Sequence, residues 1–133
     1  MKYNIFCDGG ARGNPGPAAI GVVIKDAHHQ VIKTIGQTIG AATNNQAEYR
    51  AVLAALNWLK NQPPAETTIF LDSQLLVEQL NGNYKVKNSE LKNLHSQARA
   101  LIMELGGKIG FQYIPRERNR PADQLVNEAL DKN

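Results

Sequence analysis

The sequence changes its hydrophobic period within VIKTIGQTIGAATNNQAEYRAVLAALNWL (residues 31–59), and this change decides the fold. Apolar and polar residues alternate over residues 31–39, which predicts a strand. From residue 43 the apolar positions recur at helical spacing behind Thr43-x-x-Gln46, a pattern that can form a capping box. A strand that leads directly into an amphipathic helix favours an α/β fold.

The residues before this stretch predict two more strands. Residues 2–7 alternate between apolar and polar side chains, and residues 18–25 form an apolar run. The segment 26–30 is short enough for a hairpin. The segment 9–17 contains four glycines and two prolines, and we expect it to form a stiff loop between the first two strands. The first three strands therefore form an antiparallel meander.

The residues after this stretch alternate between helices and strands. Pro63 and Pro64 end the first helix. The remaining expected elements are a strand at 67–71, a short helix at 73–80, a longer helix from a cap at Asn88 to Gly106-Gly107, a strand at 108–114 and a last helix at about 121–130. Helical crossovers join parallel strands. The order predicts an α/β fold with a five-stranded mixed sheet, three strands antiparallel and then two parallel, flanked by helices.

Length and composition set the class of protein. A chain of 133 residues with 42% apolar and 20% charged residues is typical of one globular domain, expected over residues 1–133, and excludes a disordered or fibrous chain. The longest apolar run, residues 18–24, is too short to span a bilayer, and the N-terminus lacks the features of a secretion signal. We expect a cytoplasmic protein without a membrane segment, whose single cysteine, Cys7, packs in the core.

Four acidic residues stand where strands end or helices begin. Asp8 and Asp72 follow two strands that we expect to be parallel neighbours, and ligands of α/β sheets gather at such carboxyl ends. Glu48 shares a helical stripe with Val52, which points it inward, and Asp123 opens the last helix. Each acid alone has an ordinary explanation as a cap, a turn residue or a first-turn acid. Four together indicate a carboxylate cluster.

The mutual repulsion of the carboxylates in such a cluster has to be compensated. Two carboxylates about 4 Å apart repel by roughly 4 kcal/mol at an effective dielectric constant near 20. Hard divalent cations relieve this repulsion, and a site of carboxylates without histidine suits Mg²⁺ or Mn²⁺ rather than zinc. His28 and His29 lie in an expected turn, and His95 lies on a distant helix.

Four blocks of the sequence resemble type I ribonuclease H, in order and spacing. These blocks are Phe6-Cys7-Asp8-Gly9-Gly10, Thr43-Asn44-Asn45-Gln46-Ala47-Glu48, Asp72-Ser73 and Asn119-x-x-Ala122-Asp123-x-Leu125. The match covers essentially the whole chain and is most similar to the short bacterial and archaeal form. It implies the ribonuclease H-like fold.

The resemblance also implies a function. Asp8, Glu48, Asp72 and Asp123 would hold two Mg²⁺ ions, with Mn²⁺ as a substitute, and the enzyme would cut the RNA strand of RNA–DNA hybrids to 5′-phosphate and 3′-hydroxyl ends. The residues expected to bind nucleic acid are Gly10, Arg12, Asn14, Thr43, Asn44, Asn45, Gln46, Arg116 and Arg118. Amides and main-chain groups can recognise RNA 2′-hydroxyls, which DNA lacks. We expect a monomer.

The sequence departs from the family in two places. Many relatives carry a histidine before the last acid, whereas residues 115–120 offer Arg116 and Arg118, which either bind the scissile phosphate or are surface charges. Longer relatives have a basic protrusion, whereas this segment is short here, with Tyr84, Lys85 and Lys87 as weak candidates for contacts to the DNA strand. Two alternatives remain: cleavage of double-stranded RNA, or hybrid binding without cleavage.

Overall fold

The computed structural model describes residues 1–106 and 108–132. Over these residues the elements are β1 (Lys2–Ala11), β2 (Gly16–Lys25), β3 (Val31–Ala42), α1 (Asn44–Leu59), β4 (Glu66–Leu71), α2 (Gln74–Leu80), α3 (Ser89–Leu105), β5 (Ile109–Tyr113), the 3₁₀ turn η1 (Arg116–Arg118) and α4 (Arg120–Asp131). Within them, no helix is long and apolar enough to cross a membrane.

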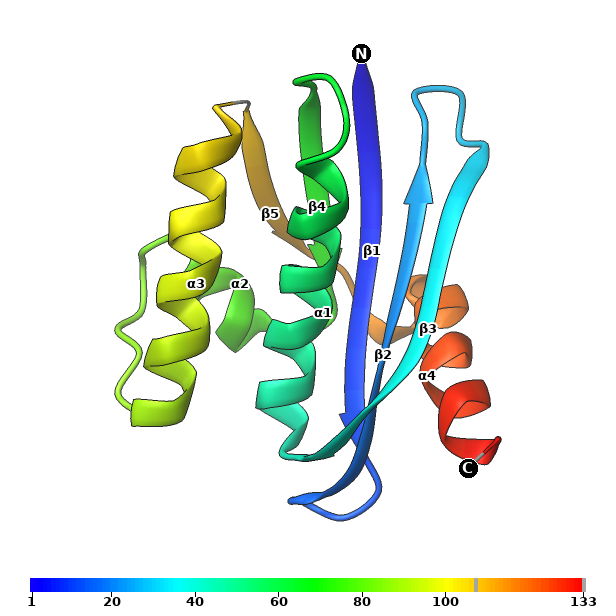
Figure 1. Cartoon of the computed structure of the whole chain (residues 1–133), viewed down its shortest axis with the longest axis vertical. Coiled ribbons are helices and arrows are strands. Elements are labelled where there is room, and N and C mark those ends of the chain that lie inside the picture. The colour runs from blue at the N-terminus through cyan, green and yellow to red at the C-terminus, as the bar shows by residue number, and fades with distance from the viewer. Residues whose placement is uncertain (107, 133) are drawn as a thin grey trace.

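The five strands form one mixed sheet in the order β3-β2-β1-β4-β5 (Figure 1). β1 pairs antiparallel with β2, and β2 pairs antiparallel with β3. β4 lies parallel to β1 on one side and to β5 on the other. The predicted fold class is therefore confirmed. Because β1 and β4 are central and parallel, their carboxyl ends meet at one edge of the sheet.

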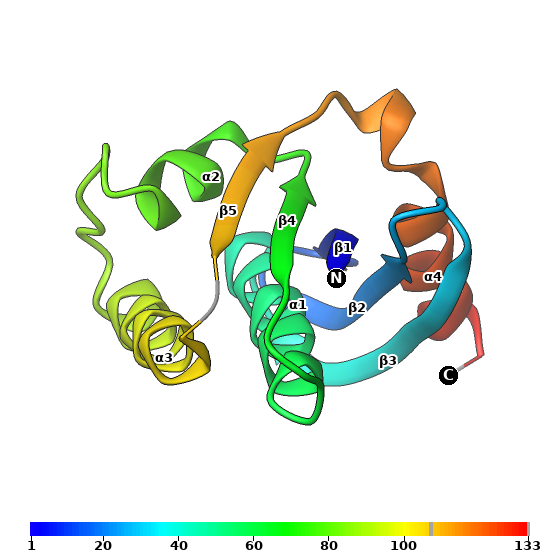
Figure 2. The ribbon, with the colours of Figure 1, turned by 90° about the horizontal axis from the view of Figure 1, so that it is seen from above.

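Helices cover both faces of the sheet. α1 and α3 pack on one face, and α4 packs on the other, against β2 and β3 (Figure 2). The main core lies under α1, where Tyr49, Val52 and Leu56 meet Ile5 and Ile69 of the central strands. A smaller cluster of Ala19, Val126 and Leu130 holds α4. The acid-bearing starts of α1 and α4 are thus fixed from opposite faces of the sheet.

The first strands are longer than the sequence suggests. β1 continues through Gly9 and Gly10 to Ala11, and β2 begins at Gly16, so only residues 12–15 remain of the loop expected over 9–17. Tertiary packing explains the difference. A Cβ atom on Gly9 would lie 2.3 Å from the Ala47 carbonyl carbon, so the missing side chain lets α1 approach the strand closely. Gly9 is therefore a strand residue whose missing side chain makes room for α1, and it is not part of a loop.

The helix ends follow the expected signals. Thr43 and Gln46 form the capping box of α1, and Asn88 caps α3. α1 ends at Leu59, before the two prolines, and α3 ends at Leu105, followed by Gly106 in the left-handed conformation. Gly107, the second residue of the predicted stop signal, lies outside the described residues. α4 is slightly longer than expected and reaches Asp131.

Gly21 allows α4 to lie close to the sheet. A Cβ atom there would lie 2.2 Å from the Ala122 carbonyl oxygen, and Gly21 pairs directly with Asp8 across the β1–β2 ladder. We expect Gly21→Ala to push α4 away and to lower the free energy of unfolding by about 1–3 kcal/mol, the usual cost of overpacking. Urea denaturation measures this change.

Gly110→Ala is the matched control, because a Cβ atom at Gly110 meets nothing within 4 Å. Equal denaturation midpoints for the two alanine variants would contradict the close approach at Gly21.

Candidate active site

Three carboxylates converge where β1 and β4 end. Asp8 lies in β1 directly after Cys7, whose partner in β4 is Leu71, and Asp72 is the first residue after β4. Glu48 reaches the same place from the first turns of α1. One carboxylate oxygen from each of the three lies within 4.8 Å of the others. The parallel pairing of β1 and β4 thus brings together acids that are 64 positions apart in the sequence.

Asp123 lies beside this group of three but is not one of its members. It stands in the first turn of α4, and its charge is one of the causes that raise the pKa of Asp8. Asp8, Glu48 and Asp123 together line a hollow of about 270 Å³. All four predicted acids therefore border one site, with three close together and the fourth on the α4 side.

The environment disfavours the charged form of two of these acids. Burial, and then the charges of Asp72, Asp123 and Glu48, raise the pKa of Asp8 to about 8. Burial and the charge of Asp72 raise the pKa of Glu48 to about 7, although a hydrogen bond from Ser73 and the charge of Arg116 oppose the shift. Without a cation, the cluster thus holds protons near neutral pH.

The donor set fits a hard divalent cation. The Oε2 atom of Glu48 is buried and has no hydrogen-bond partner within the described residues. An unpaired buried carboxylate oxygen is costly, and a bound cation would satisfy it. Asp8, Glu48 and Asp72 offer only oxygen ligands, which Mg²⁺ and Mn²⁺ prefer. We therefore assign these three side chains as the candidate metal ligands.

The raised pKa values predict how metal-free stability depends on pH. Both acids hold their protons more tightly in the folded than in the unfolded chain, so ionising them costs folding free energy. Their contribution favours the fold at low pH and weakens it as the pH rises from about 4 through about 8. Mg²⁺ binds the ionised form, so the rise in Tm that Mg²⁺ causes should grow between pH 6 and pH 9, about one unit below and above the two values. Thermal melts with Mg²⁺ and with EDTA measure this; a shift that shrinks with pH would contradict it.

Asn119 supports the acid cluster. The sequence identified it only as part of the motif that contains Asp123, and not as a residue of the site. Its side chain is fully buried, and its Nδ2 donates to the Cys7 carbonyl oxygen at 2.9 Å and to Asp72 Oδ2 at 3.0 Å. Because both partners are acceptors, the orientation of the amide is determined. Asn119 is also the N-cap residue of α4. One side chain thus joins β1, Asp72 and the helix that carries Asp123.

The predicted amide residues lie together at the start of α1. Asn14 Oδ1 accepts from the Asn44 backbone N–H at 3.0 Å, and Asn44 Oδ1 accepts from the Ala11 backbone N–H at 2.8 Å. These bonds join the β1–β2 loop to α1. Gln46 closes the capping box with Thr43 and donates to Glu90 of α3 at 2.5 Å. Asn45 lies half-buried between them.

The predicted basic residues occupy different surroundings. Arg116 lines the hollow beside Glu48 and Asp123, whereas Arg118 is exposed one residue beyond Glu117 on η1. Arg12 also lines the hollow, and its guanidinium forms an ion pair with Asp131. Gly10 lies under α4, where a Cβ atom would meet Val126 at 3.5 Å.

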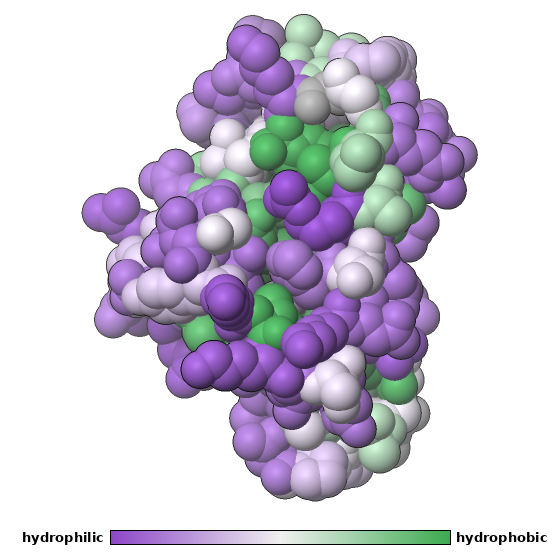
Figure 3. All heavy atoms as spheres, turned by 90° about the vertical axis from the view of Figure 1, so that its left-hand side faces the viewer, coloured by the Kyte–Doolittle hydropathy of each residue, from purple (hydrophilic) through white to green (hydrophobic). Residues whose placement is uncertain are grey.

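Tyr84, Lys85 and Lys87 are exposed on the segment between α2 and α3. Figure 3 views the molecule from the α3 side and shows mainly hydrophilic residues around smaller apolar areas. This segment lies outside the acidic hollow.

Cys7 does not take part in the chemistry. It is fully buried against α1, and burial raises the pKa of its thiol far above the usual value. A thiol in this state is a poor nucleophile. The prediction that Cys7 packs in the core is confirmed.

Comparison with known sequences identifies relatives along the whole chain. Residues 6–129 match the family described as reverse transcriptase-like. A bifunctional protein of Mycobacterium tuberculosis is 45% identical over 132 residues, which are 98% of this chain and 36% of the relative. Ribonuclease HI of Halobacterium salinarum is 38% identical over 130 residues, which are 98% of this chain and 65% of the relative. The chain thus spans about a third to two thirds of the length of these relatives.

Solved structures agree with the sequence comparison. The RNase H1 structure from H. salinarum superposes with a TM-score of 0.95 at 38% identity and covers all of both chains. LC11-RNase H1, solved in complex with an RNA/DNA hybrid, gives a TM-score of 0.94 at 44% identity over 98% of this chain and 97% of the other. The ordered acids, the strand order and these matches agree, and the chain belongs to the type 1 ribonuclease H family.

Proposed function

We propose that this protein is a metal-dependent endoribonuclease that hydrolyses the RNA strand of RNA–DNA hybrids and leaves 5′-phosphate and 3′-hydroxyl ends. The observation that carries the proposal is the convergence of Asp8, Glu48 and Asp72, with carboxylate oxygens within 4.8 Å of one another. The hybrid-bound structure of LC11-RNase H1, a relative of nearly the same length, supports the choice of substrate.

The acids would hold two divalent cations, Mg²⁺ or Mn²⁺, with Asp123 completing the site from α4. Bound cations of this kind lower the pKa of an attacking water and stabilise the departing 3′ oxygen. The side chains contribute position and charge. Asn119 holds the carboxylate of Asp72 by a hydrogen bond, and Ser73 counteracts the rise in the pKa of Glu48. No protein nucleophile is required, which agrees with the buried state of Cys7.

The polar residues around the hollow suit a nucleic-acid strand. Arg116 places a guanidinium next to Glu48, where it can pair with a phosphate of the strand being cut. Asn14 and Asn44 use their amide oxygens within the protein, so their NH₂ groups are the available donors toward ribose hydroxyls. Recognition of the 2′-hydroxyl would select RNA at the cut strand without reading sequence.

A cleavage assay tests the proposal. The protein is incubated with end-labelled RNA–DNA hybrid, double-stranded RNA and double-stranded DNA, each with Mg²⁺, Mn²⁺ or EDTA. We expect Mg²⁺- or Mn²⁺-dependent cuts in the RNA strand of the hybrid, and products that ligate without phosphatase or kinase treatment. Preferred cutting of double-stranded RNA would show that double-stranded RNA is the substrate. Binding of the hybrid without cuts in any duplex would show that the protein is a hybrid-binding module and not a nuclease.

A further inference from the structure

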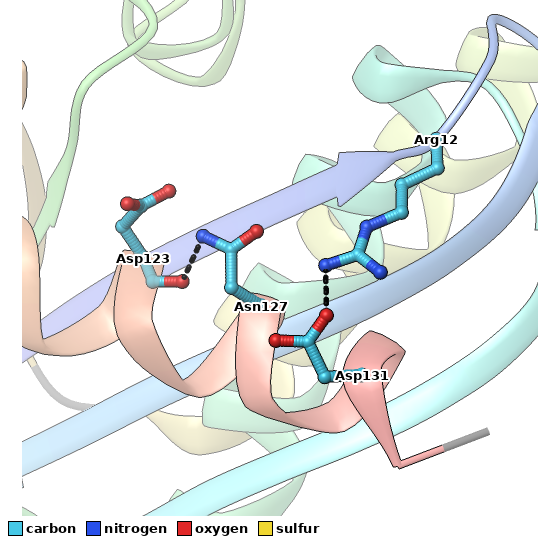
Figure 4. Close-up of polar contacts among 4 residues, drawn as sticks. All are labelled: Arg12, Asp123, Asn127 and Asp131. Atoms are coloured by element: carbon cyan, nitrogen blue, oxygen red, sulfur yellow. Dashed lines mark hydrogen bonds and ion pairs between the residues drawn. The ribbon is translucent and has the colours of Figure 1, made fainter.

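Arg12 lies at the far end of the acidic hollow, and its charge is already paired. Its Nη2 lies 2.6 Å from Asp131 Oδ1, in an ion pair that joins residues 119 positions apart (Figure 4). The pair is accessible to solvent, with half of the Arg12 side chain and two thirds of the Asp131 side chain exposed. A phosphate from solvent can therefore reach the guanidinium and compete with the carboxylate.

Asp131 ends a row of three side chains on α4, and the other two members of the row line the hollow. Asp123, Asn127 and Asp131 follow at four-residue spacing and lie on one face of α4, as Figure 4 shows. Asn127 donates to the Asp123 backbone carbonyl at 3.1 Å and lines the hollow with Arg12. The row extends about 12 Å along the helix axis from Asp123, at 1.5 Å per residue. It therefore leads from the acid cluster to Arg12.

The negative charge of Asp131 does not stabilise α4, the helix that carries it. It is the last residue of α4, where the helix macrodipole makes a negative side chain unfavourable. Its ion pair with Arg12 is the one favourable interaction of its side chain found in the described part of the chain. An exposed ion pair of this kind adds little to stability. The pair therefore adds little to the fold, and its Arg12 partner lines the hollow.

We propose that Asp131 sets the affinity of the protein for nucleic acid, by holding Arg12 in an ion pair that a backbone phosphate of the substrate must displace. The inference rests on the proposed function, because it places the substrate strand along α4. Asp131 lowers affinity in two ways: it neutralises Arg12, and it adds a negative charge beside the path of a polyanion.

Asp131→Asn tests this role. At low salt we expect KM for the hybrid to fall about two- to fivefold with kcat unchanged, the range given by an exposed ion pair. Freeing Arg12 for one phosphate should also steepen the plot of log affinity against log salt concentration by up to about 0.9. Affinity is measured separately by fluorescence anisotropy of labelled hybrid in EDTA, which needs no turnover.

Two controls separate the ion pair from bulk charge. Glu128→Gln removes the same charge from α4, but Glu128 bonds Gln124 on the exposed surface and forms no ion pair with Arg12. When Arg12 is already replaced by alanine, adding Asp131→Asn should raise the affinity for the hybrid no more than Glu128→Gln raises it in the wild type. An equal gain in affinity with and without Arg12, or unchanged or weaker binding by Asp131→Asn, would overturn the inference.

The two readouts distinguish failure of this inference from failure of the proposed function. A wild-type protein that binds the hybrid without cutting it refutes the nuclease, and the anisotropy comparison still decides the role of Asp131. A wild-type protein that neither binds nor cuts the hybrid refutes both. A protein that cuts normally and shows equal KM in the wild type and in Asp131→Asn refutes only the inference.

Discussion

Asp8→Asn should reduce kcat for the RNA–DNA hybrid by at least about a thousandfold, which corresponds to about 4 kcal/mol of transition-state stabilisation. Asp8 is the candidate ligand whose raised pKa reflects the charges of all three other acids, Asp72, Asp123 and Glu48. Asparagine keeps the shape of the side chain but removes the charge that holds a cation. Single-turnover cleavage measures the loss without interference from product release.

The same variant should be more stable than the wild type in the absence of metal. The carboxyl of Asp8 is ionised only above a pKa of about 8, and its neighbours oppose this ionisation. We expect the Tm of Asp8→Asn in EDTA to exceed that of the wild type at alkaline pH, and the two values to approach each other at acidic pH, where Asp8 is protonated in both the folded and unfolded chain. Mg²⁺ should raise the Tm of the wild type more than that of the variant.

Glu66→Gln is a suitable control, since Glu66 is exposed at the start of β4, at the opposite end of that strand from Asp72. It should change neither turnover nor the response to Mg²⁺. Wild-type turnover in Asp8→Asn would show that Asp8 is not a ligand. A variant that loses turnover together with its fold would be recognised by its melting curve.

Local patterns were sufficient to predict the elements and the convergence of the acids. The change of period at Thr43 located α1. The parallel relation of β1 and β4 followed from the antiparallel meander of β1, β2 and β3 together with the helical crossover from β3 to β4. That relation places Asp8 beside Asp72 without any knowledge of side-chain packing. The site was predictable to this extent because it depends on strand direction and on where strands end.

Features that depend on contacts distant in the sequence could not be predicted. Gly9 reads as a loop residue, yet it lies inside β1 because Ala47 packs against it. Arg12 reads as a free positive charge, but Asp131 is 119 positions away in the chain and lies next to it in the fold. In both cases the missing information is the distance between two elements that no local pattern encodes.

Asn119 belongs to the same class, because its two acceptors are 112 and 47 positions away. Asn119→Ala should lower the free energy of unfolding by about 1–3 kcal/mol, since the Cys7 carbonyl and the Asp72 carboxylate lose a buried donor. Asp72 would then be free to turn. Loss of such an orienting hydrogen bond typically lowers metal affinity or activity by about 10- to 100-fold.

Asn119→Asp should be the more damaging change, although it has nearly the same shape. A carboxylate at this place faces the Cys7 carbonyl and the Asp72 carboxylate, two acceptors to which it cannot donate while ionised. Asn93→Ala, on the exposed surface of α3, is the control for the removal of an asparagine amide.

Metal affinity decides whether Asn119 positions the site or only supports the fold. Calorimetric titration with Mg²⁺, performed below the Tm of each variant, should show weaker binding in folded Asn119→Ala protein, with a matching fall in kcat. A purely structural residue would lower the Tm and leave the affinity of the folded protein unchanged. Because Asn119 touches Asp72 directly and also begins the helix that carries Asp123, we expect both the affinity and the Tm to fall, and unchanged Mg²⁺ affinity would contradict the positioning role.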